Sequence, residues 1–251
     1  MKTQSCHTDL KKRVSRIAIV LEETLGIPIP PKKKSPPLDM LIATILSQNT
    51  NDKNSYRAYS ILRERFPSWE LVLKAKTSAI AAAIKTGGMA NQKSVRIKKL
   101  LVELMKRYGT LDLSFVKKKS NEEIFELLTS LDGVGTKTAS CVLLFSLGRE
   151  IFPVDTHIHR ICQRLGITPN SKTPDQTFEA MQPLIPKGKA YTLHTNIIRF
   201  GRKTCIARSP LCGECPLFDE CSFPEKEKFA FKKSKPVIGK NYEFMILDNV
   251  S

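Results

Sequence analysis

The sequence predicts a mostly or wholly α-helical fold, and three observations support this prediction. Apolar residues recur at three- and four-residue steps in several segments, which is typical of a helix with one buried face. Helix-start signals precede some of these segments. Alternation with a period of two, typical of a strand, is found only at residues 242–247. The chain has 251 residues and is 41% hydrophobic, enough to bury the core of one large domain or two small ones.

The first expected elements are a helix, a connector and a second, longer helix. The N-terminal helix is expected at about residues 8–25, and an extended connector rich in proline and lysine follows at residues 28–37. A clear amphipathic helix runs from Asn91 to Tyr108, and Gly109 stands where a C-terminal cap is expected. The apolar face of this helix consists of Ile97, Leu100, Leu101, Leu104, Met105 and Tyr108.

Helix-start signals place further helices in the second half of the chain. Ser120 with Glu123 has the spacing of a capping box and predicts a helix at residues 121–131. Thr173 followed by Pro174 predicts another start, because proline is favoured at the first helical position. The helical character therefore extends over most of the chain.

The charge balance points to a polyanionic partner. The chain holds 41 Lys and Arg against 24 Asp and Glu, a formal charge of +17 that is spread along its length. Nucleic acid is the favoured partner, because neutralised phosphates release counterions; a basic membrane-surface protein is the alternative. No apolar run reaches the roughly 20 residues that span a bilayer. The N-terminus has no apolar signal region, so an intracellular protein is expected, in the cytoplasm or nucleoid if prokaryotic.

Two helical patterns flank a short glycine-containing turn. The first is the segment 121–131, and the second runs over 138–147 and stops at Gly148. Gly133 and Gly135 permit positive φ and leave backbone N–H groups uncovered, so the second helix can present its positive dipole end to a phosphate. Such a contact positions nucleic acid without reading its sequence. An ordinary turn between two helices would also explain the glycines.

Lys137 follows Thr136 in this turn, just inside the expected helix start. The positive end of the helix dipole there is expected to lower the pKa of the Lys137 amine and to make it a better nucleophile when partly desolvated. A surface lysine with its ammonium in water is the alternative interpretation.

Asp155 precedes another helical pattern and has the position of its N-cap. A capped carboxylate stays ionised and fixed in direction, which suits it to stabilise a developing positive charge or to accept a proton. His157 and His159 lie on different faces of the helix and make a poor metal pair. The sequence leaves open whether they face nucleic acid or pack inside.

Four of the seven cysteines lie close together in the pattern Cys205-x6-Cys212-x2-Cys215-x5-Cys221. Their spacing permits either tetrahedral zinc or a [4Fe–4S] cluster, and on spacing alone zinc is preferred. Arg202 and Arg208 add positive charge, as expected of a loop that contacts phosphate. Among the remaining cysteines, Cys141 and Cys162 occur in apolar helical contexts and are expected to be buried.

The sequence resembles the endonuclease III family of DNA glycosylases in three features, which occur in the same order. They are the two helical segments joined by the glycine turn with Lys137, called the hairpin below, the Val-Asp-Thr-His segment at 154–157, and the cysteine spacing. The similarity runs from about Ser35 to Cys221. It implies an all-α, two-lobed helix-hairpin-helix fold with the DNA cleft between the lobes. One lobe is a six-helix barrel over residues 38–149. The iron–sulfur lobe combines 1–37 with 150–221, and 222–251 are an extension of unknown role.

The resemblance also implies roles for individual residues. Lys137 matches the family's nucleophilic lysine, Asp155 its catalytic aspartate, and the four cysteines its [4Fe–4S] ligands, which replaces the preference for zinc. Gln48 in Ser-Gln-Asn-Thr matches the residue that fills the space of the extruded base. Met89 matches the wedge, at a position that better-known bacterial enzymes fill with leucine; a gap-filling core methionine is the alternative. The residues expected to contact DNA are Gln48, Met89, Asn91, Gly133, Gly135, Thr136, His157, Arg202 and Arg208.

The implied function is base excision repair by base flipping, carried out by a monomer on double-stranded DNA with a damaged or mismatched base or an abasic site. The resemblance implies excision of oxidised pyrimidines and strand nicking by β-elimination. The residue runs that contain Asn49 and Met89, Ser-Gln-Asn-Thr-Asn-Asp and Gly-Met-Ala-Asn-Gln-Lys, also resemble those of plant demethylating glycosylases. The alternative substrate is therefore uracil or thymine opposite guanine, or modified cytosine. A non-catalytic DNA-binding module is the alternative of another class, although such a module needs neither Lys137 nor Asp155.

Overall fold

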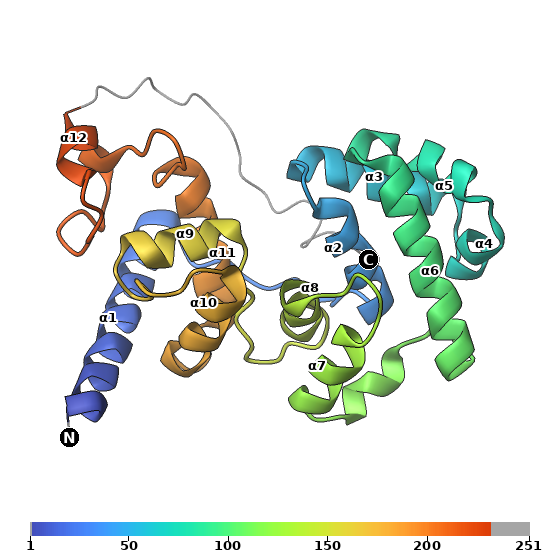
Figure 1. The fold of residues 1–251 in the computed structure, drawn as a ribbon, viewed down its shortest axis with the longest axis horizontal. Coiled ribbons are helices and arrows are strands. Elements are labelled where there is room, and N and C mark those ends of the chain that lie inside the picture. The colour runs from blue at the N-terminus through green and yellow to red at the C-terminus, as the bar shows by residue number, and fades with distance from the viewer. Residues whose placement is uncertain (1, 232–251) are drawn as a thin grey trace. The chain divides into compact units, whose positions relative to one another are not determined.

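The computed structural model describes residues 2–231, with side chains from Thr8 onward, and these residues form two compact units (Figure 1). Of the described residues, the first unit joins the chain up to Pro30 to Glu150–Phe231, and the second spans Pro31–Arg149. No strand occurs within residues 2–231, so the predicted all-α class is confirmed. The segment 242–247, where alternation suggested a strand, lies outside the described residues.

The second unit surrounds one buried helix. Every residue of α2 from Pro37 to Leu46 is buried, and α2 packs against α3, α6 and α8. A helix that is apolar on all sides belongs in such a central place. The buried Asp39 carboxylate accepts hydrogen bonds from Tyr59 Oη at 2.7 Å and Trp69 Nε1 at 3.0 Å. The α-helices of this unit are α2 (Pro37–Ser47), α3 (Asp52–Arg65), α4 (Trp69–Lys74), α5 (Thr77–Ala83), α6 (Ala90–Tyr108), α7 (Asn121–Thr129) and α8 (Thr136–Cys141).

Local sequence signals explain the ends of two of these helices. Helix α6 ends at Gly109, whose φ of 67° places it in the left-handed region, as predicted. Helix α7 begins with the predicted capping box, in which Ser120 Oγ accepts from the Glu123 N–H and the Glu123 carboxylate accepts from the Ser120 N–H. Short 3-10 turns occupy Lys85–Gly87 and Ser114–Lys118.

The helix after the hairpin differs in detail from its prediction. It begins at Thr136, two residues before the predicted start at Thr138, and changes at Val142–Ser146 into a π-helical segment (η3). The Leu147 N–H bonds to the Val142 carbonyl, five residues back, and Gly148 then ends the helix with a φ of 67°. Such widened turns are rare and are not encoded by apolar periodicity.

The first unit is built around α11, which packs against α1 and α9. Helix α1 begins at Lys2 and ends at Leu25, so it is longer at its start than the predicted 8–25. Cys162 is fully buried in this unit and Cys141 in the other, as predicted. The α-helices of this unit are α1 (Lys2–Leu25), α9 (Thr156–Arg164), α10 (Pro174–Met181), α11 (Ala190–Lys203) and α12 (Lys226–Ala230).

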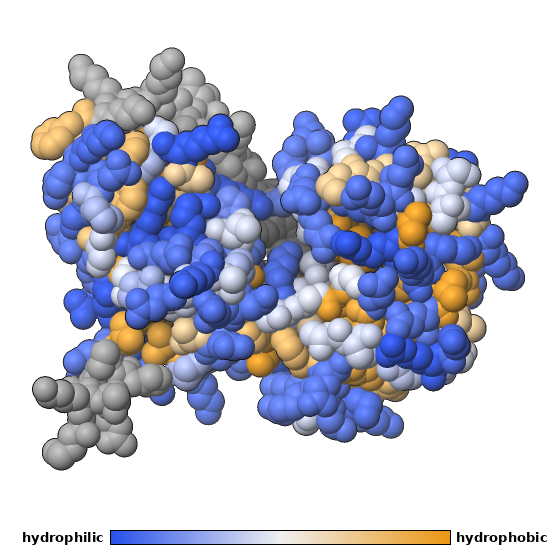
Figure 2. Space-filling model, in the orientation of Figure 1, coloured by the Kyte–Doolittle hydropathy of each residue, from blue (hydrophilic) through white to orange (hydrophobic). Residues whose placement is uncertain are grey.

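The surface is dominated by polar and charged side chains. Figure 2 shows hydrophilic residues over most of the visible face of each unit, with apolar residues in smaller areas between them. None of the helices in the described part of the chain has the length and apolar character needed to cross a membrane.

Candidate active site and cluster site

The hairpin turn between α7 and α8 uses its two glycines differently. Gly133 has a φ of 78°, which favours glycine, as predicted. Gly135 has a φ of −93° and is the N-cap of α8, so it does not use the positive φ that glycine permits. A side chain at Gly135 would meet no atom within 4 Å, and no side chain caps this helix start. The place where a capping side chain would lie is therefore open, as an anion site at a helix start requires.

Lys137 is the second residue of α8, and its side chain is half-buried. It is followed by the buried Thr138 and Ala139, which anchor the helix in the core. Thr136 is also half-buried, and its carbonyl accepts a bond from Ser140 Oγ at 2.6 Å. The amine is therefore attached to a rigid element at the exposed start of that element.

The segments that contain Asn49 and Met89 both have a strained backbone and lie next to each other in the second unit. Asn49 and Met89 have φ angles of 52° and 51°, and no other non-glycine residue in the described part of the chain has positive φ. Asn49 Nδ2 lies 3.6 Å from Met89 Sδ. Such backbone strain is typical of functional sites. Met89 is 47% exposed, which rules out the interpretation that it fills a gap in the core.

Gln48 lies at the end of α2, immediately before Asn49, and its side chain is half-buried. Its Oε1 accepts a hydrogen bond from Arg96 Nη1 at 2.7 Å. Asn91 is the second residue of α6 and is exposed. Gln48, Met89 and Asn91 are thus all accessible on one unit.

Asp155 caps α9 as the sequence predicts. Its Oδ1 accepts from the Ile158 N–H at 2.9 Å, and its side chain is half-buried. His159 packs inside the unit, with Nδ1 at 2.7 Å from Thr177 Oγ1. His157 is half-buried, and its Nδ1 lies 3.3 Å from Arg160 Nη2. The carboxylate is therefore held in one direction by the helix that it begins.

Arg160 connects α9 with the loop that carries the cysteines. Its Nη2 donates to the carbonyls of Gly201 at 3.2 Å and Cys205 at 3.0 Å. Burial lowers the pKa of Arg160 from its ordinary value. The sequence signals did not single out Arg160, because one arginine in a basic chain carries no distinctive spacing.

All four predicted cysteines line a single cavity in the first unit. Cys212 is 8% exposed, and the others are half-buried. Burial raises the pKa of the Cys215 thiol to about 12, and repulsion from the three neighbouring thiolates adds to the shift. Nowhere in the described residues are three His, Cys, Asp or Glu side chains grouped closely enough for one metal ion. Four thiols that line one cavity have the donor chemistry that an iron–sulfur cluster requires.

The chain beyond Cys221 packs onto this loop. Phe223 lines the cavity, and the Arg164 guanidinium lies 4.4 Å from its ring centre. Arg164 also donates to Cys205 Sγ at 3.3 Å. A side chain at Gly213 would approach the Ala230 carbonyl to 2.6 Å, so α12 packs directly on the cysteine loop. Phe223 thus contributes to the lining of the cysteine cavity, and α12 covers the loop that holds the cysteines. In the same part of the chain Arg202 is half-buried and Arg208 is exposed.

The two groups of predicted residues belong to different units. Lys137, Gln48, Met89, Asn91 and the hairpin glycines lie in the second unit. Asp155, His157, Arg202, Arg208 and the four cysteines lie in the first. Each unit therefore supplies one catalytic candidate together with its own set of candidate DNA contacts.

Comparison with known proteins identifies the class of this fold and site. Residues 42–187, more than half of the chain, match the HhH-GPD superfamily of base excision DNA repair proteins. Residues 205–221 match the iron–sulfur binding domain of endonuclease III. The second match covers all four cysteines and agrees with their arrangement around one cavity.

Individual proteins give the same result. The chain is 36% identical over 191 residues to endonuclease III of Thermotoga maritima, a match that covers 76% of this chain and 85% of that protein. It is 37% identical over 178 residues to a "Putative DNA glycosylase" of Arabidopsis thaliana, of whose length it spans 58%. A solved structure of a trapped endonuclease III–DNA covalent intermediate is similar with a TM-score of 0.73 and 26% identity, covering 87% of this chain and 97% of that one.

The chain therefore belongs to the endonuclease III family of DNA glycosylases. Its cofactor is the [4Fe–4S] cluster of that family. The helix-hairpin-helix fold predicted from the sequence is confirmed by the same matches.

Proposed function

We propose that the protein is a bifunctional DNA glycosylase and AP lyase of base excision repair. The observation that carries this proposal is the place of Lys137: a half-buried side chain on the first turn of a helix that has no side-chain cap and has free space beside its N-cap residue, Gly135. A phosphate bound by the N–H groups of that start would bring the sugar–phosphate backbone next to the amine. A pure binding module has no use for a nucleophile there.

The proposed reaction begins with extrusion of the target nucleotide, which costs a few kcal/mol and least for a damaged or mismatched base. Gln48 and Met89 hold the duplex open. The Lys137 amine attacks C1′ and the base departs with the bonding electrons of the glycosidic bond. The Asp155 carboxylate stabilises the positive charge that develops at the sugar. The C1′–O4′ bond then breaks, O4′ takes up a proton that the attacking amine loses, and a Schiff base forms between Lys137 and C1′. This Schiff base permits loss of a proton from C2′ and of the 3′ phosphate, which nicks the strand.

The cysteine loop has a structural part in this proposal. Cys205, Cys212, Cys215 and Cys221 are the proposed cluster ligands, and the bound cluster would fix the fold of the loop. Arg202 and Arg208 then present positive charge to DNA phosphates. The proposed domains are a six-helix barrel over 38–149 and a cluster domain formed by 1–37 and 150–221. The contacts of Phe223 with the cysteine cavity and of Ala230 with Gly213 support including residues 222–231 in the latter.

Oxidised pyrimidines are the proposed substrates, in double-stranded DNA and with the protein acting as a monomer in the compartment that holds the DNA. Uracil or thymine opposite guanine, or modified cytosine, is the second candidate. The residue runs Ser-Gln-Asn-Thr-Asn-Asp and Gly-Met-Ala-Asn-Gln-Lys, which are similar to those of plant demethylating glycosylases, support this candidate. A panel of duplexes with one defined lesion each, scored separately for base release and strand cleavage, discriminates between the two.

Borohydride trapping tests the nucleophile. The wild-type protein is expected to form a covalent adduct with an abasic duplex, and Lys137→Ala to form none. Lys106→Ala is a matched control, because Lys106 is an exposed lysine of α6 outside the proposed site. Trapping that persists in Lys137→Ala would refute this role of Lys137.

A further inference from the structure

One buried ammonium joins the two segments that carry Gln48 and Met89. Lys93 lies in α6 and is 3% exposed. Its Nζ donates to the carbonyls of Leu46 and Gly87, each at 2.8 Å. Leu46 is in the last turn of α2, two residues before Gln48, and Gly87 is two residues before Met89. A cation is favoured at carbonyls of a helix C-terminus, so Lys93 stabilises both strained segments at once.

Arg96 lies three residues further along α6, on the surface, and contacts the Gln48 side chain. A guanidinium has only donors, so the oxygen of the Gln48 amide must face it and the amide nitrogen is left to donate elsewhere. The stem of Arg96 lies against the hairpin: a side chain at Gly133 would approach Arg96 Cδ and Nε to 2.8 Å. Gly133 thus provides the space that lets one arginine contact both Gln48 and the hairpin turn.

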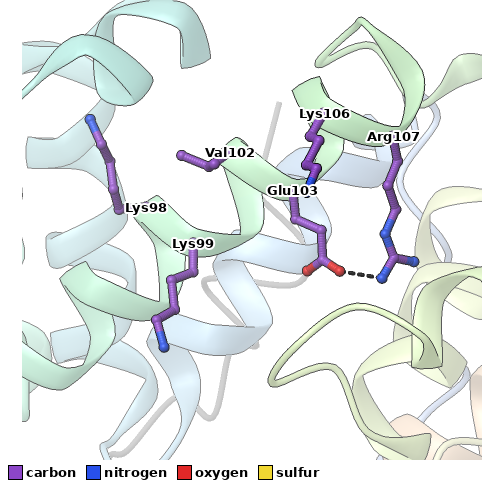
Figure 3. A pocket seen from close by; sticks show the side chains of 6 residues that line it. All are labelled: Lys98, Lys99, Val102, Glu103, Lys106 and Arg107. Carbon is purple, nitrogen blue, oxygen red and sulfur yellow. Dashed lines mark hydrogen bonds and ion pairs between the residues drawn. The ribbon is translucent and has the colours of Figure 1, made fainter.

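Residues nearer the C-terminal end of α6 form hydrogen bonds with the hairpin turn. Glu103 Oε2 accepts from the Asp132 N–H at 3.2 Å, and Arg107 Nη1 donates to Ser130 Oγ at 2.7 Å. Lys99 Nζ lies 4.0 Å from Asp132 Oδ2. Figure 3 shows Lys99, Glu103 and Arg107 projecting from α6, with Glu103 and Arg107 paired to each other. Helix α6 is therefore a continuous brace from the Gln48 and Met89 segments to the turn before Lys137.

We propose that Lys93 and Arg96 are positioning residues, which set Gln48 and Met89 in the geometry for insertion before DNA binds and couple that geometry to the hairpin. This inference rests on the proposed function, since it assumes that Gln48 and Met89 enter the duplex. Preorganisation lowers the cost of ordering these side chains when the base is extruded. Lys93 acts on the backbone of both segments, and Arg96 acts on the Gln48 side chain.

The test uses a duplex with a tetrahydrofuran abasic analogue opposite 2-aminopurine. The analogue cannot form a Schiff base, so the fluorescence of the estranged 2-aminopurine reports insertion independently of any Lys137 chemistry. Arg96→Met is expected to weaken insertion roughly tenfold, because it removes a hydrogen bond from a charged donor. Lys106→Met removes the same charge from an exposed position of α6 and is expected to leave the insertion signal of the bound complex unchanged.

A double-mutant cycle identifies the mode of action. If Arg96 acts through Gln48, the effect of Arg96→Met disappears in a Gln48→Ala background. Equal insertion by Arg96→Met and wild type, or additive effects in the cycle, would overturn the proposal. A wild-type protein that gives no fluorescence change also overturns it. A wild type that inserts but fails borohydride trapping overturns only the lyase proposal. Lys93→Met is expected to reduce insertion at least as much as Arg96→Met, and if it does not fold, the Arg96 series still decides.

Discussion

The two catalytic candidates stand at the starts of two helices that are built in opposite ways. Helix α8 follows its N-cap residue Gly135, has no side-chain cap, and has free space beside that glycine. Helix α9 begins at Asp155, whose carboxylate accepts the Ile158 N–H and so occupies the helix start. The positive end of one helix is left open for an external anion, while that of the other is satisfied from within. Helix starts can thus serve either to bind a phosphate or to orient a carboxylate, and the N-cap residue decides which.

The largest expected effect is a loss of strand cleavage when Lys137, at the uncapped start of α8, is replaced. Lys137→Ala should reduce strand cleavage of an abasic duplex by roughly a thousandfold or more, because it removes the nucleophile itself. Affinity for the same duplex should change little, since Gly135 and the backbone of α8 remain. Cleavage rates and equilibrium binding of the variant and of Lys106→Ala separate the two effects. Loss of binding equal to the loss of cleavage would mean that Lys137 is only a phosphate contact.

At the start of α9, the substitution Asp155→Asn removes the negative charge of the side chain but keeps its ability to cap the helix. Asparagine caps helices as well as aspartate does, so the melting temperature should stay near that of the wild type. Base release should fall by about a hundred- to a thousandfold, because the developing positive charge loses its partner. Single-turnover base release on a duplex with a preferred lesion measures this change. An unaltered rate would reduce Asp155 to a structural cap.

Gly135→Asp would convert the open start into a capped one. The φ of −93° and the free space around Gly135 admit a side chain, so α8 should gain about 0.5–1 kcal/mol of stability. DNA affinity should fall roughly tenfold at low salt, because the new carboxylate competes with a phosphate for the same N–H groups. Gly135→Ser supplies a cap without the charge and is the control. Wild-type affinity in Gly135→Asp would contradict a phosphate site at this helix start.

The smallest effect compares two substitutions at Asp155. Asp155→Ala removes the cap as well as the charge, and should be less stable than Asp155→Asn by about 1 kcal/mol. In a protein of this size that difference corresponds to a melting temperature lower by roughly 2–4 °C. Thermal unfolding of the two variants followed by circular dichroism measures it. Equal melting temperatures would show that the Ile158 hydrogen bond contributes nothing net.

The sequence indicated features that depend on neighbouring residues. The capping box of Ser120 and Glu123, the end of α6 at Gly109 and the cap at Asp155 are formed within one or two helical turns. The four cysteines need only a short loop to surround one cavity. Local spacing is sufficient for such features, because the partners are close in the chain whatever the rest of the fold does.

Sequence patterns left other features undetermined. Lys93 occupies the buried face of α6, four residues before Ile97, and that misplaced charge is the signal that could have marked it. Arg96 carries no such signal, and its contact with Gln48 spans 48 positions in the sequence. The residue type likewise left open which of the two hairpin glycines has positive φ; the structure shows that it is Gly133 and not Gly135.

The sequence by itself determined the helical class, the end of α6, the starts of α7 and α9, and the cysteine loop of this protein. Only the tertiary structure decided that one glycine of the hairpin needs positive φ while the other provides open space, that Met89 is exposed, and that Lys93 and Arg96 brace Gln48. The physical reason is the distance in sequence between the residues that interact. Caps and periodicity are encoded by residues within a few positions of each other, whereas a brace depends on which distant segments the folded core brings together.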